Sequence, residues 1–402
     1  MNSTTIPSFS RQSPEWLKDN VAVIRELHDG DHWLARSETG LEFLSYDRVR
    51  NLLRGKEFAP GIANAFRIGN VPKHVDIFVE DGLLPAIDGD RHKRIRKILL
   101  DALTLRQVDT QRGLMQKIAN RLLDPMVRNG GGDFVGEFTH RYPIEVVSEI
   151  IGVPVEDIPI FEEWTIAIGH LGDPPIGSGF PQADAAIGAM VDYLRDLVTK
   201  RRKDPRPDLL TALIEANDRD REITENELLY NMVNLLMAGH DTTRFQMAWA
   251  ILLLTRHPDQ FEALRKNHNL VPNAIAEAMR VRPANRRTFR LPRAPMEIDG
   301  FKFEPTDLLV ANIEAANLDP KKFPKPEEFD IRRENAGDHL TFGHGPHLCA
   351  GASISRVEMA EAMKVFITRI KHFDIVKDPS FVANSSIFSG PNTLDLAFRE
   401  TA

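Results

Sequence analysis

The chain has one cysteine, Cys349, among its 402 residues. A single cysteine excludes an internal disulfide and any zinc or iron–sulfur site that needs several thiolates. It permits a reducing compartment, and we expect a cytoplasmic location. The formal net charge of −7 also excludes a generally basic surface, so nucleic acid is not an expected partner.

Long apolar runs are absent as well. Without 18 consecutive apolar residues the sequence predicts no membrane span, and its first twenty residues lack the pattern of a secretory signal. No internal repeat or clear linker divides the chain. A hydrophobic content of 42% is typical of a globular protein with a sizeable core. We therefore expect one large domain over residues 1–402, present as a monomer.

Helical patterns fill residues 91–258 and are broken by Gly/Pro clusters at 128–133, 171–181 and 203–208. Residues 32–46 read as a small hairpin around a Ser-Glu-Thr-Gly turn. After residue 284, short extended runs alternate with turns. The expected fold class is mainly α with a smaller β portion.

One predicted helix is unusually long. Thr224 and Glu227 form a capping-box signature, and Pro258 ends the helical pattern. The roughly 33 residues between them would span about 50 Å, enough to cross a domain. Because the second half is apolar nearly all round, we expect this helix to be buried.

The centre of this helix, AGHDTT (residues 238–243), is a poor helix sequence. Glycine costs roughly 1 kcal/mol in a helix interior, and burying an unpartnered carboxyl costs more. One interpretation is a packing kink, with threonine hydroxyls bonding back to the preceding turn. The other is a local opening, where Gly239 admits a large ligand and Asp241 and Thr242 deliver protons.

The cysteine lies in TFGHGPHLCAG (residues 341–351), where glycines permit turns and let a flat ligand approach the backbone. A thiolate held in such a turn is a suitable iron ligand. A structural buried cysteine is one alternative. A nucleophilic cysteine with His347 as base is another, although the helper histidine of cysteine hydrolases normally lies far away in sequence.

The segment FGHGPHLCAG resembles the haem-binding signature of the cytochrome P450 family, Phe-Gly-x-Gly-x-His-x-Cys-x-Gly, at every defined position. The family's Ala-Gly-x-Asp/Glu-Thr motif is matched by AGHDT in the long helix. Its Glu-x-x-Arg motif is matched by Glu277 and Arg280, and Arg333 resembles the arginine that joins this pair. These motifs occur in family order over essentially the full chain.

The resemblance implies the cytochrome P450 fold, with haem b beneath the long central helix and Cys349 as the axial ligand of the iron. It implies that Thr242 and Asp241 deliver protons during oxygen activation. Residues expected at the haem are His92, Arg96, Arg290 and His347 at the propionates, Phe342, Gly343, Gly345 and Gly351 in the cysteine loop, and Ala238 and Gly239 on the central helix.

The implied activity is that of a monooxygenase, which inserts one atom of dioxygen into a small, mainly apolar substrate by hydroxylation, epoxidation or dealkylation. Electrons would come indirectly from NAD(P)H through an external ferredoxin and its reductase. A basic patch of Lys93, Arg94, Lys97 and Arg356 is a candidate docking site for the ferredoxin. A peroxide-driven peroxygenase and a non-enzymatic haem-thiolate sensor are the alternatives.

Family-like positions also predict the substrate pocket. The residues expected to face the substrate are Leu235, Ala238, Phe289, Ile387 and Phe388, which make a mainly apolar wall. Arg286 and Arg287 are candidates for binding a substrate carboxylate, although a salt bridge at a surface or at the haem edge is the alternative role for either.

Overall fold

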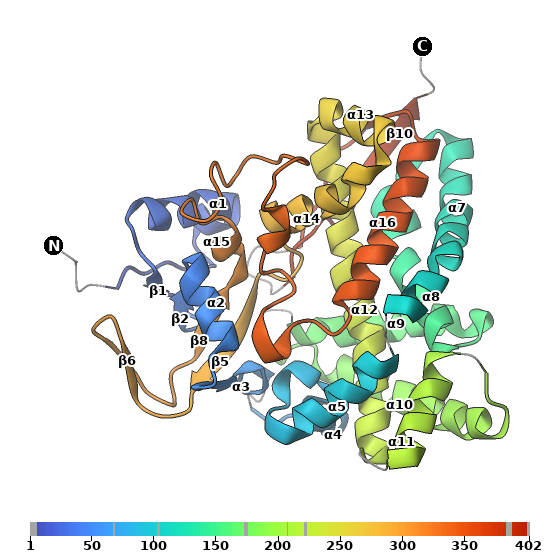
Figure 1. Cartoon of the computed structure of the whole chain (residues 1–402), viewed down its shortest axis with the longest axis horizontal. Helices are drawn as coiled ribbons and strands as arrows, with labels where there is room; N and C mark the ends of the chain where they lie inside the picture. The colour runs from blue at the N-terminus through green and yellow to red at the C-terminus, as the bar shows by residue number, and fades with distance from the viewer. Residues whose placement is uncertain are drawn as a thin grey trace.

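The computed structural model describes residues 6–66, 69–102, 105–172, 176–206, 208–220, 223–382 and 388–399 (Figure 1). Helices make up most of the molecule, and the largest sheet lies at one side with α1 and α2. The predicted class, mainly α with a smaller β portion, is confirmed. Among the helices described, none has both the length and the apolar character required to cross a bilayer.

The strands form three sheets. The largest has the order β1-β2-β8-β5-β3, with β2 and β8 parallel and the other neighbours antiparallel. A second sheet has the order β4-β10-β9, and β6 pairs with β7. The strands are β1 (Leu34–Arg36), β2 (Leu41–Phe43), β3 (Phe58–Pro60), β4 (Gly131–Asp133), β5 (Arg287–Pro292), β6 (Met296–Ile298), β7 (Phe301–Phe303), β8 (Leu309–Asn312), β9 (His372–Ile375) and β10 (Asp395–Arg399).

The α-helices are α1 (Pro14–Asp29), α2 (Tyr46–Arg54), α3 (Ile62–Phe66), α4 (Lys73–Ile77), α5 (Gly89–Ala102), α6 (Leu105–Thr110), α7 (Arg112–Asn129), α8 (Tyr142–Ile151), α9 (Ile158–Gly169), α10 (Phe180–Lys203), α11 (Leu209–Asp220), α12 (Glu225–Arg256), α13 (Pro258–Lys266), α14 (Val271–Val281), α15 (Ile313–Asn317) and α16 (Ala352–Arg369). Shorter helical turns are η1 (Phe78–Gly82), η2 (Leu84–Ala86), η3 (Val135–Thr139), η4 (Val155–Asp157), η5 (His170–Gly172), η6 (His268–Leu270), η7 (Ala336–Asp338) and η8 (Gly345–His347).

The predicted hairpin at 32–46 is confirmed as β1 and β2, with Leu34 opposite Phe43. The loop predicted at 128–133 is wrong in part, because its glycines form β4 against β10. A Cβ on Gly131 would lie 2.0 Å from the Leu396 carbonyl oxygen, so only glycine allows this pairing distance. The same residue that suggested a loop is thus required by the strand.

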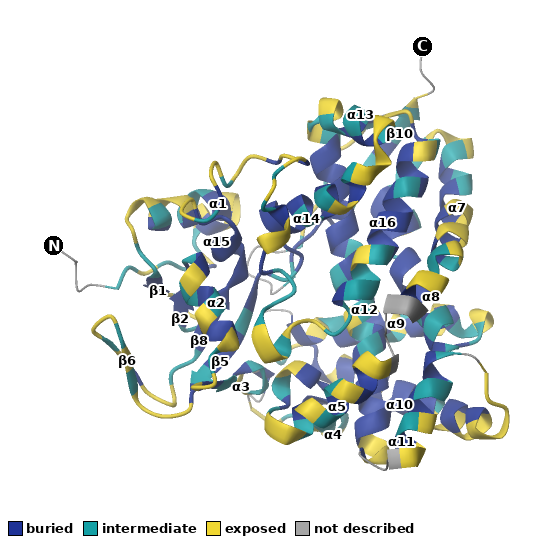
Figure 2. Ribbon diagram, viewed as in Figure 1, coloured by how far each residue is buried: buried dark blue, intermediate teal, exposed yellow. Residues whose placement is uncertain are grey.

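The long helix is α12, and its predicted limits are confirmed. Thr224 Oγ1 accepts from the Glu227 amide at 3.1 Å, and the Glu227 carboxylate accepts from the Thr224 amide at 2.8 Å. Its 32 residues extend about 48 Å. Figure 2 shows buried residues concentrated along the central helices, whereas outer helices such as α13 carry exposed faces.

Two apolar cores meet on α12. Its first half, from Leu228 to Leu236, packs in a core with α5 and α8–α11. Its second half, from Met247 to Leu254, packs in another with α7, α14 and α16. The polar segment at residues 238–243 falls between the two cores. The ionisable residues His240 and Asp241 thus lie between the two apolar cores, while Asn231 and Asn234 lie within the first half of the helix.

His240 ties this central stretch to the neighbouring chain. It is fully buried, its Nε2 lies 2.7 Å from the His140 carbonyl oxygen, and its Nδ1 lies 2.9 Å from Thr165 Oγ1. Burial, reinforced by the positive charge of Arg244, lowers the pKa of His240 to about 3. The ring is therefore neutral in the folded protein and donates its Nε2 proton to the His140 carbonyl.

This histidine predicts a specific acid sensitivity. Because the folded pKa is depressed, the unfolded chain binds the extra proton below pH 6.5 and stability falls as the pH drops. His240 alone should contribute about 2 kcal/mol of lost unfolding free energy between neutral pH and pH 5. Urea unfolding should be measured at neutral pH and at pH 5. Between these two pH values, His240→Gln should lose about 2 kcal/mol less unfolding free energy than the wild-type protein. Equal losses in both proteins would contradict the assignment.

Candidate functional site

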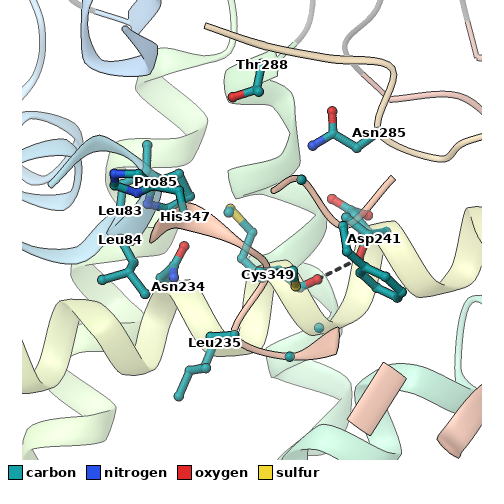
Figure 3. Close-up of a pocket in the computed structure, with 18 of the residues that line it drawn as sticks. Leu83, Leu84, Pro85, Asn234, Leu235, Asp241, Asn285, Thr288, His347 and Cys349 are labelled. Atoms are coloured by element: carbon teal, nitrogen blue, oxygen red, sulfur yellow. Dashed lines mark hydrogen bonds between the residues drawn. The ribbon is translucent and has the colours of Figure 1, made fainter. Parts of the chain in front are cut away.

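A cavity of about 340 Å³ lies between α12 and the cysteine loop, residues 341–351. Segments from α5, η1, η2 and β5 complete its wall. Figure 3 shows Leu83, Leu84 and Pro85 on one side, Asn285 and Thr288 on another, and Cys349 between them. The sulfur and the polar centre of α12 thus border one space.

The cysteine loop is shaped by two glycines in the left-handed region. Gly343 has φ 74° and Gly345 has φ 75°, and a Cβ on Gly345 would lie 2.7 Å from the Arg54 Cα of α2. The Cys349 amide donates to the Phe342 carbonyl at 2.8 Å, which closes the turn. Gly351 differs from this expectation, because its φ of −84° suits any residue. A Cβ there would lie 3.7 Å from Ile354 Cγ2 and 3.9 Å from the Cys349 sulfur, which are ordinary van der Waals distances.

Cys349 is exposed and lines the cavity, and Gly345, Pro346 and Leu348 of the same loop are exposed as well. Burial raises the pKa of its thiol, and the Gly351 amide, Arg96 and Arg356 act in the opposite direction. These three groups would stabilise a thiolate once a metal displaces the proton. The donor set therefore fits a sulfur ligand to a metal.

Four nitrogen-bearing side chains gather at the edge of the cavity. They are His92 and Arg96 on α5, Arg290 on β5 and His347 in the cysteine loop. The rings of His92 and His347 lie 4.1 Å apart, and His92 Nε2 and His347 Nδ1 are buried with no hydrogen-bond partner among the described residues. The guanidinium of Arg96 likewise has no acceptor in the described chain. The cluster contains donors in excess of acceptors.

The electrostatics of this cluster point to a missing anion. Burial, then repulsion from His92 and Arg290, lowers the pKa of His347 to about 3. Burial lowers the pKa of Arg290 to about 10, although Asp88 partly offsets it. Asp88 is itself paired with Arg293. Negative carboxylates bound here would relieve the repulsion, so the site fits the two propionates of a haem.

Glu277 sits at the centre of a buried ionic cluster. It and Arg280 are both fully buried, and their side chains are joined by two hydrogen bonds of 2.7 and 2.8 Å. Arg333 Nε reaches the same carboxylate at 2.9 Å. Arg280 also donates to the carbonyls of Asn317, Pro326 and Glu328. One carboxylate thus connects α14 to the long segment that precedes the cysteine loop.

That segment is in turn fastened to the loop. The side-chain nitrogen of Asn317, Nδ2, donates to Thr341 Oγ1 at 3.0 Å. Thr341 Oγ1 in turn donates to the Met279 carbonyl at 2.8 Å. The Leu340 amide donates to Asn317 Oδ1 at 2.7 Å. The ionic cluster therefore sets where the cysteine loop begins.

The polar centre of α12 borders the cavity but does not open. The helix is continuous, and Thr242 Oγ1 donates to the Ala238 carbonyl at 2.8 Å, as the first interpretation of this segment expected. Ala238 and Thr242 line the cavity. Gly239 borders it through its backbone, and a Cβ there would lie 3.3 Å from Val147 of α8. The glycine permits close packing of two helices, and the expected local opening is not present.

Four of the five candidate substrate residues line the cavity, namely Leu235, Ala238, Phe289 and Phe388. The fifth, Ile387, lies outside the described residues. Arg287 also lines it, and burial lowers the pKa of its guanidinium to about 9. Arg286 points elsewhere, because its Nη2 donates to Ser389 Oγ at 2.6 Å and its Nε lies 3.7 Å from Glu314. A substrate carboxylate at Arg286 is therefore not supported.

Sequence reasoning missed several polar groups in the cavity wall, among them Asn234 and Glu358. Asn234 lies two helical turns before Thr242 on the same face of α12, and a polar residue at that spacing was a readable signal. Glu358 on α16 is buried, and burial raises the pKa of its carboxyl to about 8. Its only signal in the sequence was an acidic residue within the apolar run of a helix.

Comparison with known proteins agrees with this geometry. The family described as Cytochrome P450 matches residues 175–391. Cytochrome P450 monooxygenase PikC of Streptomyces venezuelae is 34% identical over 331 residues, which cover 81% of this chain and 77% of that protein.

The chain belongs to the cytochrome P450 family. The mycinamicin IV hydroxylase/epoxidase of Micromonospora griseorubida is 32% identical to this P450, covering 87% of this chain and 85% of that one. The solved structure of CYP109Q5 from Chondromyces apiculatus superposes with a TM-score of 0.88 at 25% identity, over 99% and 100% of the two chains. The predicted P450 fold is confirmed. This P450 is a monooxygenase, an oxidoreductase that incorporates oxygen, and its family implies haem and dioxygen.

Removing the Glu277 carboxylate should destabilise the segment that precedes the cysteine loop and holds it in place. Glu277→Ala leaves the buried Arg280 and the partly buried Arg333 without their charge partner, which costs about 3–5 kcal/mol. Thermal unfolding and the haem content of the purified protein measure the loss. Glu262→Ala, which removes an acid from the partly exposed pair with Arg265, is the matched control and should cost under about 1 kcal/mol. Similar stabilities for the two variants would contradict this role of Glu277.

Proposed function

We propose that this P450 binds haem b through the Cys349 thiolate and oxidises a small, mainly apolar substrate with electrons from a ferredoxin. The observation that carries the proposal is the single cavity that joins the Cys349 sulfur, a ring of unpartnered donors and the polar centre of α12. Each of the three matches one requirement of haem-thiolate chemistry, namely an iron ligand, anchors for the propionates and a source of protons.

Under this proposal the chain's residues hold the cofactor from two sides. Cys349 would supply the sulfur ligand of the iron. His92, Arg96, Arg290 and His347 would bind the propionates, which would satisfy the groups that lack partners, such as His92 Nε2 and His347 Nδ1. Bound haem iron supplies the activation of dioxygen.

Proton delivery is assigned to Thr242 and Asp241. The Thr242 hydroxyl borders the cavity and holds its proton toward the Ala238 carbonyl, from which one rotation of χ1 redirects it. Asp241 adjoins it in sequence, also borders the cavity and is paired with Arg244 at 2.8 Å. A hydroxyl and a carboxyl at this position favour use of dioxygen over a peroxide-driven reaction, since only the former requires protons to be delivered from the protein.

The cavity wall supports an apolar substrate with a few polar contacts. Leu235, Ala238, Phe289 and Phe388 provide apolar surface, while Asn234, Asn285 and Thr288 interrupt it with groups that form hydrogen bonds. Such a wall suits an apolar skeleton that carries a small number of oxygen or nitrogen atoms. The relatives named above do not by themselves specify the compound.

Electrons must reach the cysteine side of the haem, and α2 contributes a basic side chain there. Arg54 approaches Gly345 of the cysteine loop, is exposed, and has no acidic partner among the described residues. The α5 part of the expected patch is weaker, because Lys93 pairs with Asp90, Lys97 with Asp101, and Arg94 lies 3.6 Å from Glu227. Its fourth member, Arg356 on α16, is exposed and lies over the Phe342 ring. We therefore place the ferredoxin near Arg54. NAD(P)H as the ultimate donor, a cytoplasmic location and a monomeric state stay predictions.

The iron ligand is tested by substitution. Cys349→Ala should abolish the red-shifted Soret band of the ferrous carbonyl complex, because that band requires a thiolate opposite carbon monoxide. Leu348→Ala changes the neighbouring exposed residue and should keep the band. Retention of the band in Cys349→Ala would overturn the assignment.

The docking site is tested by charge reversal. Arg54→Glu should lower the rate of reduction by a plant-type ferredoxin roughly threefold to tenfold at low salt, with the difference fading as salt is raised. Lys18→Glu on α1 makes the same change of charge at a site away from the cysteine loop and should have little effect. Stopped-flow reduction under carbon monoxide measures both rates. An equal loss in the two variants would argue for a general charge effect.

A further inference from the structure

A polar cluster includes Asp241 and extends from it away from the cavity. It consists of Asp241, His240 and Arg244 on α12, His140 just before α8, and Glu162 and Thr165 on α9. None of these residues except Asp241 was assigned a role above in the reaction. The cluster links the carboxyl expected to deliver protons with a carboxylate near the surface.

The contacts form a series from Asp241 to Glu162. Arg244 Nε donates to Asp241 Oδ1 at 2.8 Å, and Arg244 Nη1 lies 3.1 Å from His140 Nδ1. On the other side of the ring, His140 Nε2 lies 3.3 Å from Glu162 Oε1. The Asp241 side chain is 6% exposed, Arg244 17%, His140 19% and Glu162 27%. The series therefore passes from the buried carboxyl of Asp241 toward solvent.

These contacts determine the protonation of His140. A guanidinium donates only, so His140 Nδ1 must accept and carry no proton. The ring proton is then on Nε2, facing the Glu162 carboxylate. Burial, followed by the neighbouring His240 and the positive charge of Arg244, lowers the pKa of His140 to about 4, which agrees with a neutral ring. Burial raises the pKa of Glu162, while Arg141 lowers it and Glu163 raises it.

The cluster also orients Asp241. While Oδ1 is held by Arg244, Oδ2 faces Gly169, the last residue of α9, where a Cβ would lie only 2.7 Å away. Gly169 and Asp241 both border the cavity. The carboxyl is thus held between a cation on one side and the cavity edge on the other.

We propose that His140 and Arg244 are positioning residues for Asp241: the neutral imidazole of His140, oriented by Glu162, anchors the Arg244 guanidinium, which holds the Asp241 carboxyl at the edge of the cavity. The inference rests on the proposed role of Asp241 in proton delivery. It adds a route of control, because the strength of the Arg244–Asp241 pair decides the pH at which the carboxyl takes up a proton. The other charged groups that face the cluster are Glu162, Glu163, Arg141 and His240.

The test follows oxygen consumption by the holoenzyme when a ferredoxin, its reductase and NADPH supply both electrons of the cycle. The rate is measured across a range of pH with these partners in excess. In His140→Phe and in Arg244→Gln the midpoint of the pH profile should rise by about one unit, since a carboxyl that loses a neighbouring cation is protonated more readily. In the double variant it should rise no further, because both changes act through one contact.

Two variants separate this role from a general structural one. His140→Asn keeps an acceptor oxygen close to the position of Nδ1 and should restore the original midpoint. His257→Phe removes a histidine at the other end of α12, where Nδ1 contacts the Leu253 carbonyl at 2.8 Å, and should leave the midpoint unchanged. Additive shifts, or no shift in either single variant, would overturn the proposal. A wild-type protein that consumes no oxygen when both electrons are supplied would instead contradict the proposed function.

A second readout does not depend on turnover. In the diamagnetic ferrous carbonyl form, ¹⁵N-labelled histidine should show the proton of His140 on Nε2 alone. Arg244→Gln should shift the Nδ1 resonance, because that nitrogen loses its charged donor. A proton found on Nδ1 in the wild-type protein would contradict the contact on which the proposal rests.

Discussion

The position of the single thiol depends on one buried carboxylate. Glu277 pairs with both Arg280 and Arg333, and the donors left on these two arginines reach five backbone carbonyls in the segment from Asn317 to Glu328. Asn317 and Thr341 pass this restraint to the start of the cysteine loop. An irregular segment cannot be held by a regular ladder of hydrogen bonds, so the side chains supply the partners that its backbone requires. The ionic cluster replaces secondary structure in this part of the fold.

The same division between apolar support and polar function occurs on α12. Apolar packing over both halves of the helix stabilises it, which allows its centre to carry Asp241, Thr242 and His240 despite their poor helix propensity. His240 forms hydrogen bonds with the His140 carbonyl oxygen, next to η3, and with Thr165 Oγ1 on α9. Asp241 is paired with Arg244. His240 and Asp241 therefore each have a partner that orients them.

The sequence predicted the ends of α12 well because the signals are local, namely the Thr224 capping box and Pro258. It also identified Cys349 and its loop, since a signature of fixed spacing needs no knowledge of the fold. It could not predict that Gly239 faces Val147, because packing between α12 and α8 brings together residues far apart in sequence. The same limit applies to His140 and Glu162, which reach Asp241 only through Arg244. Gly131 was misread because a glycine needed for close strand pairing looks like a loop glycine.

The central claim is that the sulfur of Cys349 is bonded to haem iron while the ring of donors around His347 and Arg290 holds the propionates. X-ray absorption at the iron edge of the purified ferric protein tests it directly. The account predicts one sulfur among the atoms bonded to iron, together with the four porphyrin nitrogens. A coordination sphere made only of nitrogen and oxygen would contradict it.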